Sequence, residues 1–183
     1  MLWFFTPYSH EKKFLVAIDR YFDLVTNPSD WIVITDGDTA FLRPDFGDVI
    51  KRYTDLYPET GLFTCYASRC HYKCQVPPGT DMENVSILYH RSIANVQAER
   101  FKGQVIELNR RIAGHLMVIR KSTWTRIRSE VFVTASAKQI LGVDTKISNA
   151  ILAKGLKIRL MCELYIFHYL RMAEGFSYKA HLL

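Results

Sequence analysis

The stretch WIVITDGDTAF, residues 31–41, constrains the fold more than any other part of the chain. Five mostly apolar, β-prone residues, Trp31 to Thr35, run directly into Asp36-Gly37-Asp38. A short continuous apolar run bounded by turn residues is typical of a strand that is buried on both faces. The sequence therefore predicts a buried strand that ends in two carboxylates, and raises the question of what those carboxylates do.

Strand-like and helix-like segments alternate along the chain. Strands are expected at residues 2–6, 31–35, 61–67, 105–108, 115–119, 156–160 and 164–169. Helices are expected to begin at Ser9, Asp45, Thr80, Ser122 and Asp144, each of which can cap a helix. This alternation predicts an α/β fold in one domain, a mixed sheet flanked by helices.

The third of these helices carries the most detailed expectation. Thr80 and Glu83 have the spacing of a capping box. We expect a helix from there with Val85, Leu88 and Val96 on one side, together with Ser92. Gly155 stands where a glycine ends the last helix.

Composition and charge bound the class of protein. With 183 residues, 49% of them hydrophobic, the chain has the size and core content of one folded domain. The net charge of +6 suits an anionic partner, but the basic residues are scattered, so no nucleic acid is expected and a peripheral membrane contact stays open. No signal peptide or membrane-spanning stretch is evident, which predicts a cytoplasmic protein with reduced cysteines.

The two carboxylates suggest a metal site. In α/β sheets, ligands bind outside the carboxyl ends of the strands, where Asp36 and Asp38 would lie. Hard carboxylate oxygens suit Mg²⁺ or Mn²⁺ carrying substrate phosphates, and Gly37 would let the backbone turn tightly and approach a ligand. The simpler alternative is an Asp-Gly turn that only ends a strand.

With these residues in view, the sequence resembles the nucleotide-sugar-dependent glycosyltransferases of the GT-A fold, particularly the family 2-like members. The motifs that carry the resemblance are WIVITDGDTAFL, GHLMVIRKSTW, VDTKISNAILAKGLKI and YIFHYLR, in that order. Each motif is weak alone, but the ordered set spans roughly residues 2–171. The resemblance implies a single GT-A-like (Rossmann-like) domain over residues 1–183.

The resemblance also implies a metal centre. Asp38 would bind the metal directly, and Asp36 would contact the metal or the ribose or sugar of the donor. His168 would be a third metal ligand; otherwise it is a core histidine with satisfied hydrogen bonds. An imidazole beside carboxylates favours Mn²⁺ over Mg²⁺.

By the same resemblance, Asp144 would be the general base of an inverting transfer, deprotonating the hydroxyl of a saccharide or other acceptor. The alternative is that Asp144 only caps its helix. Gly114 and His115 would line the pocket for the acceptor and the donor sugar. His115 could instead be a polar residue at a strand end.

The donor would be a UDP- or GDP-linked sugar. Thr6, Pro7 and Tyr8 follow the first strand and would contact the nucleotide, with Tyr8 on the base, and Arg171 would contact the phosphates. Family members usually carry a further strand and helix before the D-x-D motif. Only about 30 residues separate the first strand from Asp36, so that unit is missing and base recognition must differ.

Other functions remain open from the sequence. Cys65, Cys70, His71 and Cys74 lie within ten residues and could hold zinc in a nucleic-acid-binding module. Paired carboxylates also serve metal-dependent nucleotidyl transfer, although residues 6–13 contain no glycine for a phosphate loop. A glycosyltransferase-like domain that binds without catalysis is a third alternative.

Overall fold

The computed structural model describes residues 1–10, 13–133 and 142–169. The strands are β1 (Leu2–Phe5), β2 (Trp31–Thr35), β3 (Thr39–Phe41), β4 (Leu62–Ala67), β5 (Val105–Glu107), β6 (Leu116–Arg120) and β7 (Ile158–His168). The helices are α1 (Phe14–Leu24), α2 (Phe46–Leu56), α3 (Ile87–Arg100), α4 (Lys121–Val133) and α5 (Val143–Ala153), with a short 3₁₀ turn η1 (Lys73–Gln75). Within these ranges no helix is long and apolar enough to cross a membrane.

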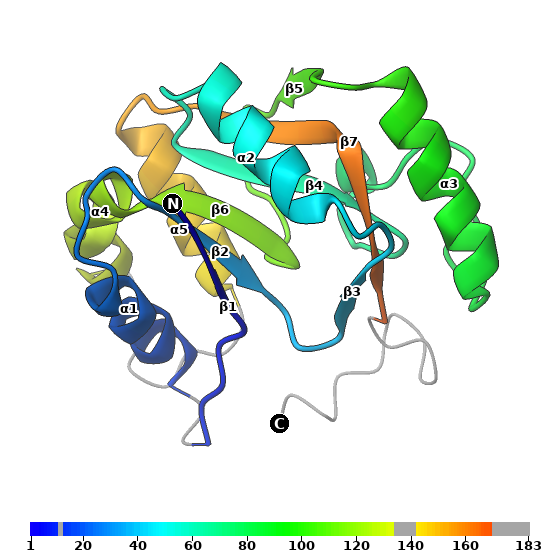
Figure 1. Ribbon diagram of the computed structural model, residues 1–183. Helices are drawn as coiled ribbons and strands as arrows, with labels where there is room; N and C mark the ends of the chain where they lie inside the picture. The colour runs from blue at the N-terminus through cyan, green and yellow to red at the C-terminus, as the bar shows by residue number, and fades with distance from the viewer. Residues whose placement is uncertain (11–12, 134–141, 170–183) are drawn as a thin grey trace.

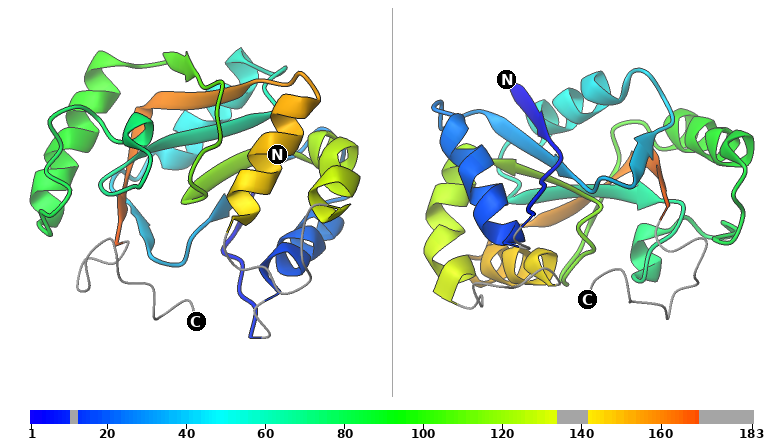
Figure 2. Two further views of the ribbon diagram at one scale, coloured as in Figure 1. Left: turned by 180° about the vertical axis from the view of Figure 1, so that it is seen from behind. Right: turned by 90° about the horizontal axis from the view of Figure 1, so that it is seen from below.

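The strands form one mixed sheet in the order β1-β2-β6-β4-β7-β3, with β5 also paired to β7. The pairs β1/β2 and β4/β7 are parallel and the others are antiparallel. Helices α1, α4 and α5 lie on one side of this sheet and α2 on the other, while α3 runs beside β7 (Figures 1 and 2). The predicted α/β mixed sheet flanked by helices is confirmed.

Strand β2, which pairs with β1 on one edge and β6 on the other, shows why both faces of the sheet are covered. All five of its residues are buried. Because side chains alternate between the faces of a strand, Ile32 and Ile34 enter the hydrophobic core formed with α1, α4 and α5, whereas Trp31 and Val33 enter the core formed with α2. The strand expected to be buried on both faces is therefore present.

The prediction for α3 was wrong in its start, and the side of the helix with Leu88, Ser92 and Val96 is exposed to solvent. The helix begins at Ile87 with Ser86 as its cap, because the side chains of Asp81 and Asn84 accept hydrogen bonds from backbone N–H groups two residues on and hold this segment in turns. The exposed residues on α3 and before it are Val85, Leu88 and Val96, and the buried ones are His90, Ala94, Gln97 and Ala98.

Three other helix starts also differ from the expected caps. Lys13, not Ser9, precedes α1, although the Ser9 hydroxyl accepts a hydrogen bond from the Lys13 N–H. Helix α4 follows β6 without a break, so Ser122 lies inside it. Gly142 is the N-cap of α5, which places Asp144 in the first turn. Gly155, with a φ of 68°, follows the end of α5 as predicted.

The late strands 156–160 and 164–169 are in fact one strand, β7, of 11 residues. The register against β4 shifts between Cys65 and Tyr66, so the extra residues of β7 form an irregularity that does not end the strand. Strand β3 was not predicted.

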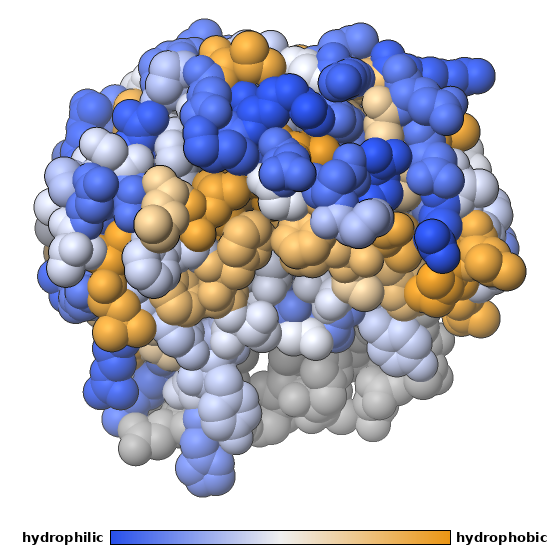
Figure 3. Space-filling model, viewed as in Figure 1, coloured by the Kyte–Doolittle hydropathy of each residue, from blue (hydrophilic) through white to orange (hydrophobic). Residues whose placement is uncertain are grey.

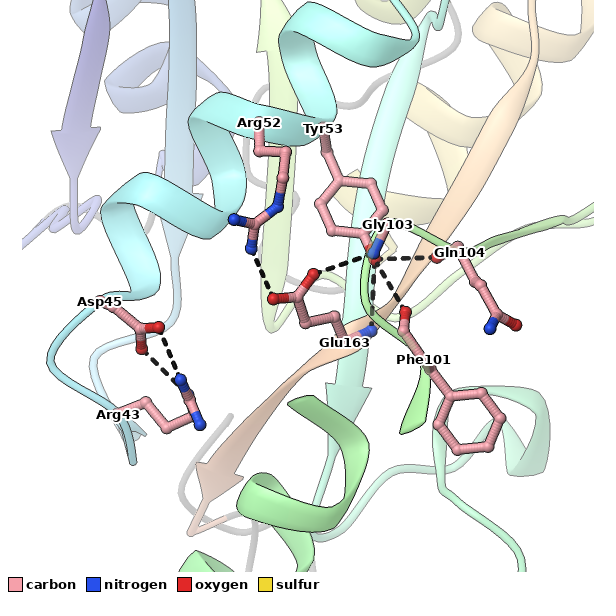
Figure 4. Close-up of polar contacts among 8 residues, drawn as sticks. All are labelled: Arg43, Asp45, Arg52, Tyr53, Phe101, Gly103, Gln104 and Glu163. Atoms are coloured by element: carbon pink, nitrogen blue, oxygen red, sulfur yellow. Dashed lines mark hydrogen bonds and ion pairs between the residues drawn. The ribbon is translucent and has the colours of Figure 1, made fainter. Parts of the chain in front are cut away.

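Glu163 lies at this irregularity and is 3% exposed. Its carboxylate accepts hydrogen bonds from Arg52 Nη2 of α2 at 2.5 Å and from the Gly103 N–H at 3.0 Å (Figure 4). Beside it, the Tyr53 hydroxyl donates to the Gln104 carbonyl at 2.9 Å. These contacts join α2, β7 and the segment before β5, and so fix the position of the strand that carries His168.

Candidate metal centre

Asp36, Asp38 and His168 come together where β2 and β7 end. The pairings of β2 with β6, β6 with β4 and β4 with β7 make β2 and β7 run in the same direction, so both carboxyl ends lie at one edge of the sheet. Thr39 of β3 pairs with His168, and the Tyr169 N–H donates to the Asp38 carbonyl at 2.9 Å. Backbone hydrogen bonds therefore place Asp38 beside His168.

The spacing of the three side chains fits a metal ion. His168 Nε2 lies 3.3 Å from Asp38 Oδ1 and 3.9 Å from Asp36 Oδ2. Ligand atoms about 2.1 Å from one ion at adjacent octahedral positions would be roughly 3.0 Å apart, so these distances need only small adjustments. Within the described ranges, this is the one group of three or more histidine, cysteine or acidic residues with a suitable geometry.

The orientation of His168 also fits a ligand role. Its Nδ1 lies 2.9 Å from the Arg69 carbonyl oxygen, which can only accept, so Nδ1 carries the hydrogen. In the neutral ring the lone pair is then on Nε2, the atom that faces the two carboxylates. Hydrogen bonds of this kind commonly orient histidines that bind metals.

The backbone of His168 is also held in place. Its N–H donates to the Ser68 hydroxyl at 2.9 Å, and the residue is 4% exposed. Sequence reasoning missed both supporting residues, Ser68 and Arg69, because they lie in a segment expected to be a loop and no motif marks them.

The two carboxylates have different environments. Burial raises the pKa of Asp36 to about 6, with the charges of Asp38 and Asp144 adding to this and that of His168 opposing it. Burial also disfavours the charged form of Asp38, but the hydrogen bond and charge of His168 outweigh this and lower its pKa. Without a bound cation, Asp38 is the carboxylate that ionises more readily.

Asp144 lies close enough to affect Asp36 electrostatically. Burial raises its pKa, opposed by hydrogen bonds from the backbone N–H groups of Thr145, at 2.7 Å, and Gly114. A Cβ atom at Gly114 would stand 3.1 Å from that of Asp144, so the glycine permits this close approach. Asp144 is thus a half-buried carboxylate with raised basicity near the metal group.

His115 is fully buried. Its Nε2 donates to the Cys65 carbonyl at 3.1 Å, and its ring centre lies 5.5 Å from that of His168. Burial, together with the charge of His168, lowers its pKa to about 3, so the ring is neutral at physiological pH. The side chain is therefore enclosed in the core beside His168.

The residues expected to contact the nucleotide follow β1. The Thr6 hydroxyl lies 3.1 Å from that of Thr35, Pro7 is buried and Tyr8 is 75% exposed. Gly37 is not among the glycines with positive φ, so its turn does not require glycine. Arg171 lies outside the described residues.

The cysteine cluster lacks the geometry of a metal site in the described residues. Cys65, Cys70, His71 and Cys74 are not among the groups with metal-binding geometry in the described part of the chain. Burial raises the pKa of Cys65 well above its usual value and that of Cys70 to about 12, so both remain thiols. Zinc binds thiolates, so neither the arrangement nor the protonation of these residues favours the zinc module.

No known family model matches this chain, and a comparison with curated proteins finds no relative.

Proposed function

We propose that this protein is a metal-dependent glycosyltransferase that moves a sugar from a nucleotide-sugar donor to a hydroxyl acceptor. The observation that carries the proposal is the group of Asp36, Asp38 and His168 at the carboxyl ends of β2 and β7. Sheets of this kind bind their ligands at such an edge. Two carboxylates and an imidazole suit Mn²⁺, with Mg²⁺ as the alternative.

In this proposal, Asp38 and His168 bind the ion, and Asp36 binds it or the ribose or sugar of the donor. The ion, when bound, supplies positive charge that stabilises the departing nucleoside diphosphate. The hydrogen bond to the Arg69 carbonyl keeps His168 Nε2 directed at the carboxylates, so this ligand is oriented before the ion binds.

Asp144 would accept the proton from the attacking hydroxyl, which makes the transfer inverting. Its raised pKa favours proton uptake, and its position near Asp36 places it beside the metal group. Tyr8 is exposed and available to stack on the base of a UDP- or GDP-linked donor, with Thr6 and Pro7 beside it. Arg171 would contact the donor phosphates, and the acceptor would be a saccharide or other hydroxyl compound.

The experiment that tests the proposal is calorimetric titration of Mn²⁺, followed by UDP and GDP with and without the ion. We expect Mn²⁺ binding and Mn²⁺-dependent nucleotide binding, each weakened at least about tenfold by Asp38→Ala. Asp48→Ala is the matched control, because Asp48 is an exposed acid in α2. If Mn²⁺ binds and neither nucleotide does, the metal centre stands and the transferase is wrong. If Mn²⁺ does not bind, both fail.

A further inference from the structure

A cavity of about 280 Å³ lies at the amino end of β2, at the opposite edge of the sheet from the metal group. Its lining includes Ser29, Trp31, Lys51, Thr54, Asp55 and Arg120. On the face shown in Figure 3, hydrophilic side chains gather over α2, which contributes Lys51 to the cavity. The five residues of β2 separate this cavity from Asp36 by roughly 16 Å, at about 3.3 Å per residue.

Arg120 is held in place in this cavity but has unused donors. It pairs across the strands with Trp31, and its guanidinium carbon lies 4.6 Å from the centre of the indole ring, which is almost fully buried. Among the described residues this guanidinium has no hydrogen bond or ion pair, and its Nε is buried without a partner. Stacking uses the face of the guanidinium, so the donors left for a ligand in the cavity are the N–H groups of its two terminal nitrogens.

The other charges at the cavity are already paired. Lys51 lies 2.5 Å from Asp55, and both side chains are more than half exposed, so this pair is weak and easily rearranged. The Thr54 hydroxyl donates to the Lys51 carbonyl. Within the part of the chain that the structure describes, Arg120 therefore has no counter-ion, and Lys51 lines the same cavity.

We propose that this cavity binds an oxyanion, the phosphate or carboxylate group of a small molecule, with Arg120 as the main donor and Lys51 as the second. A planar guanidinium binds either group through two parallel hydrogen bonds. The volume is just below the roughly 300–1,000 Å³ of pockets for drug-sized ligands, so it suits a small anion better than a whole nucleotide. This site is independent of the metal group and of the proposed transfer.

The test is a titration of the whole protein with inorganic phosphate and, separately, acetate, followed by the NMR signals of the Arg120 Nε–H and the Trp31 indole. Chloride keeps the ionic strength constant, and EDTA removes metal ions. We expect saturable shifts, with affinity at least tenfold weaker in Arg120→Gln and about two- to fivefold weaker in Lys51→Gln. Arg91→Gln, which removes an exposed arginine of α3, is the matched control and should bind like the wild type.

The two ligand chemistries are separated by the same titrations. Tighter binding of phosphate assigns the site to phosphorylated compounds, and tighter binding of acetate assigns it to carboxylates. Arg120→Lys keeps the charge but loses the planar donor, so it should bind with intermediate affinity, and it serves if Arg120→Gln does not fold. Non-saturating shifts in the wild type, or equal affinity in wild type, Arg120→Lys and Lys51→Gln, would overturn the proposal.

Discussion

The Nδ1 atom of His168 lies 2.9 Å from the carbonyl oxygen of Arg69. This single contact fixes the tautomer of the histidine and directs Nε2 at Asp38 and Asp36. The orientation of His168 is thus set by the backbone of a neighbouring segment.

The raised pKa of Asp36 predicts that Asp36→Asn increases the free energy of unfolding of the metal-free protein, by an amount that depends on pH. Folding raises this pKa from 3.8 to about 6, so the stability contributed by the protonated form is complete below pH 3.8 and is lost as the pH rises through 6. Asparagine stays uncharged at every pH. At pH 8 we expect the free energy of unfolding to rise by roughly 1 kcal/mol, and at pH 3.5 by almost nothing. The value at pH 8 is smaller than the pKa shift alone implies, because the side chain is partly exposed and solvent screens its charge. Urea unfolding with EDTA measures both, and an equal effect at the two pH values contradicts the assignment.

Asp144→Asn should abolish most of the proposed transfer while Mn²⁺ and nucleotide binding persist. The amide keeps the shape of the side chain but cannot accept the proton of the acceptor, and loss of general base catalysis costs about 10²- to 10⁴-fold in turnover. Asp48→Asn is the control, because Asp48 occupies the first turn of α2 as Asp144 does that of α5. Unchanged turnover by Asp144→Asn would remove the base assignment and leave the metal centre intact.

Gly114→Ala should damage the site through Asp144. The new Cβ would lie 3.1 Å from that of Asp144, so the first turn of α5 must move, at a cost of about 1–3 kcal/mol. Gly47→Ala is the contrast, since no atom lies within 4 Å of a Cβ there and α2 should gain about 0.5–1 kcal/mol. Thermal unfolding of the two variants is expected to shift in opposite directions. A neutral Gly114→Ala would show that Asp144 is not packed against this glycine.

Glu163→Ala should be the most destabilising of these changes. It leaves Arg52, whose Nε is already buried without a partner among the described residues, and the Gly103 N–H without an acceptor. Removing one partner of such a buried ion pair costs about 3–5 kcal/mol of stability. Because Arg52 is partly exposed, we expect a loss near the lower end, about 3 kcal/mol. Glu107→Ala, which removes the exposed pair with Lys157, should cost less than about 1 kcal/mol. If urea unfolding shows that Glu163→Ala and Glu107→Ala lose similar amounts of stability, the buried ion pair of Glu163 does not stabilise the fold more than an exposed pair does.

The local patterns of the sequence were sufficient for the α/β class and for the buried strand with its acidic end. The run from Trp31 to Thr35 is read correctly because burial on both faces leaves a continuous apolar string. Strand β3 could not be read, since its three residues form a strand only where the edge of β7 offers backbone partners. The buried side of α3 could not be identified from the sequence for a related reason. Its apolar side chains Leu88 and Val96 are exposed, so the hydrophobic spacing marks the side that faces solvent.

The site was partly predictable as well. Asp36, Asp38 and His168 carry distinctive chemistry at recognisable positions, and the structure brings them within 4.8 Å of one another. The support from Arg69 could not be foreseen, because it uses a backbone carbonyl, which every residue possesses. Which carbonyl meets His168 depends on how the segment after β4 folds, and that is a property of the tertiary structure.

The pairing of β3 with β7 means that main-chain hydrogen bonds position the candidate metal ligands, whereas their side chains determine which ion they suit. Thr39 faces His168 across the two strands, and the Tyr169 N–H holds the Asp38 carbonyl, all through main-chain atoms. The side chains at positions 38 and 168 can therefore be substituted while the distance between the two backbone positions is kept. Position 168, at the end of β7, is therefore the place to change the metal preference: cysteine or glutamate there would present a softer or a harder ligand atom to the same frame.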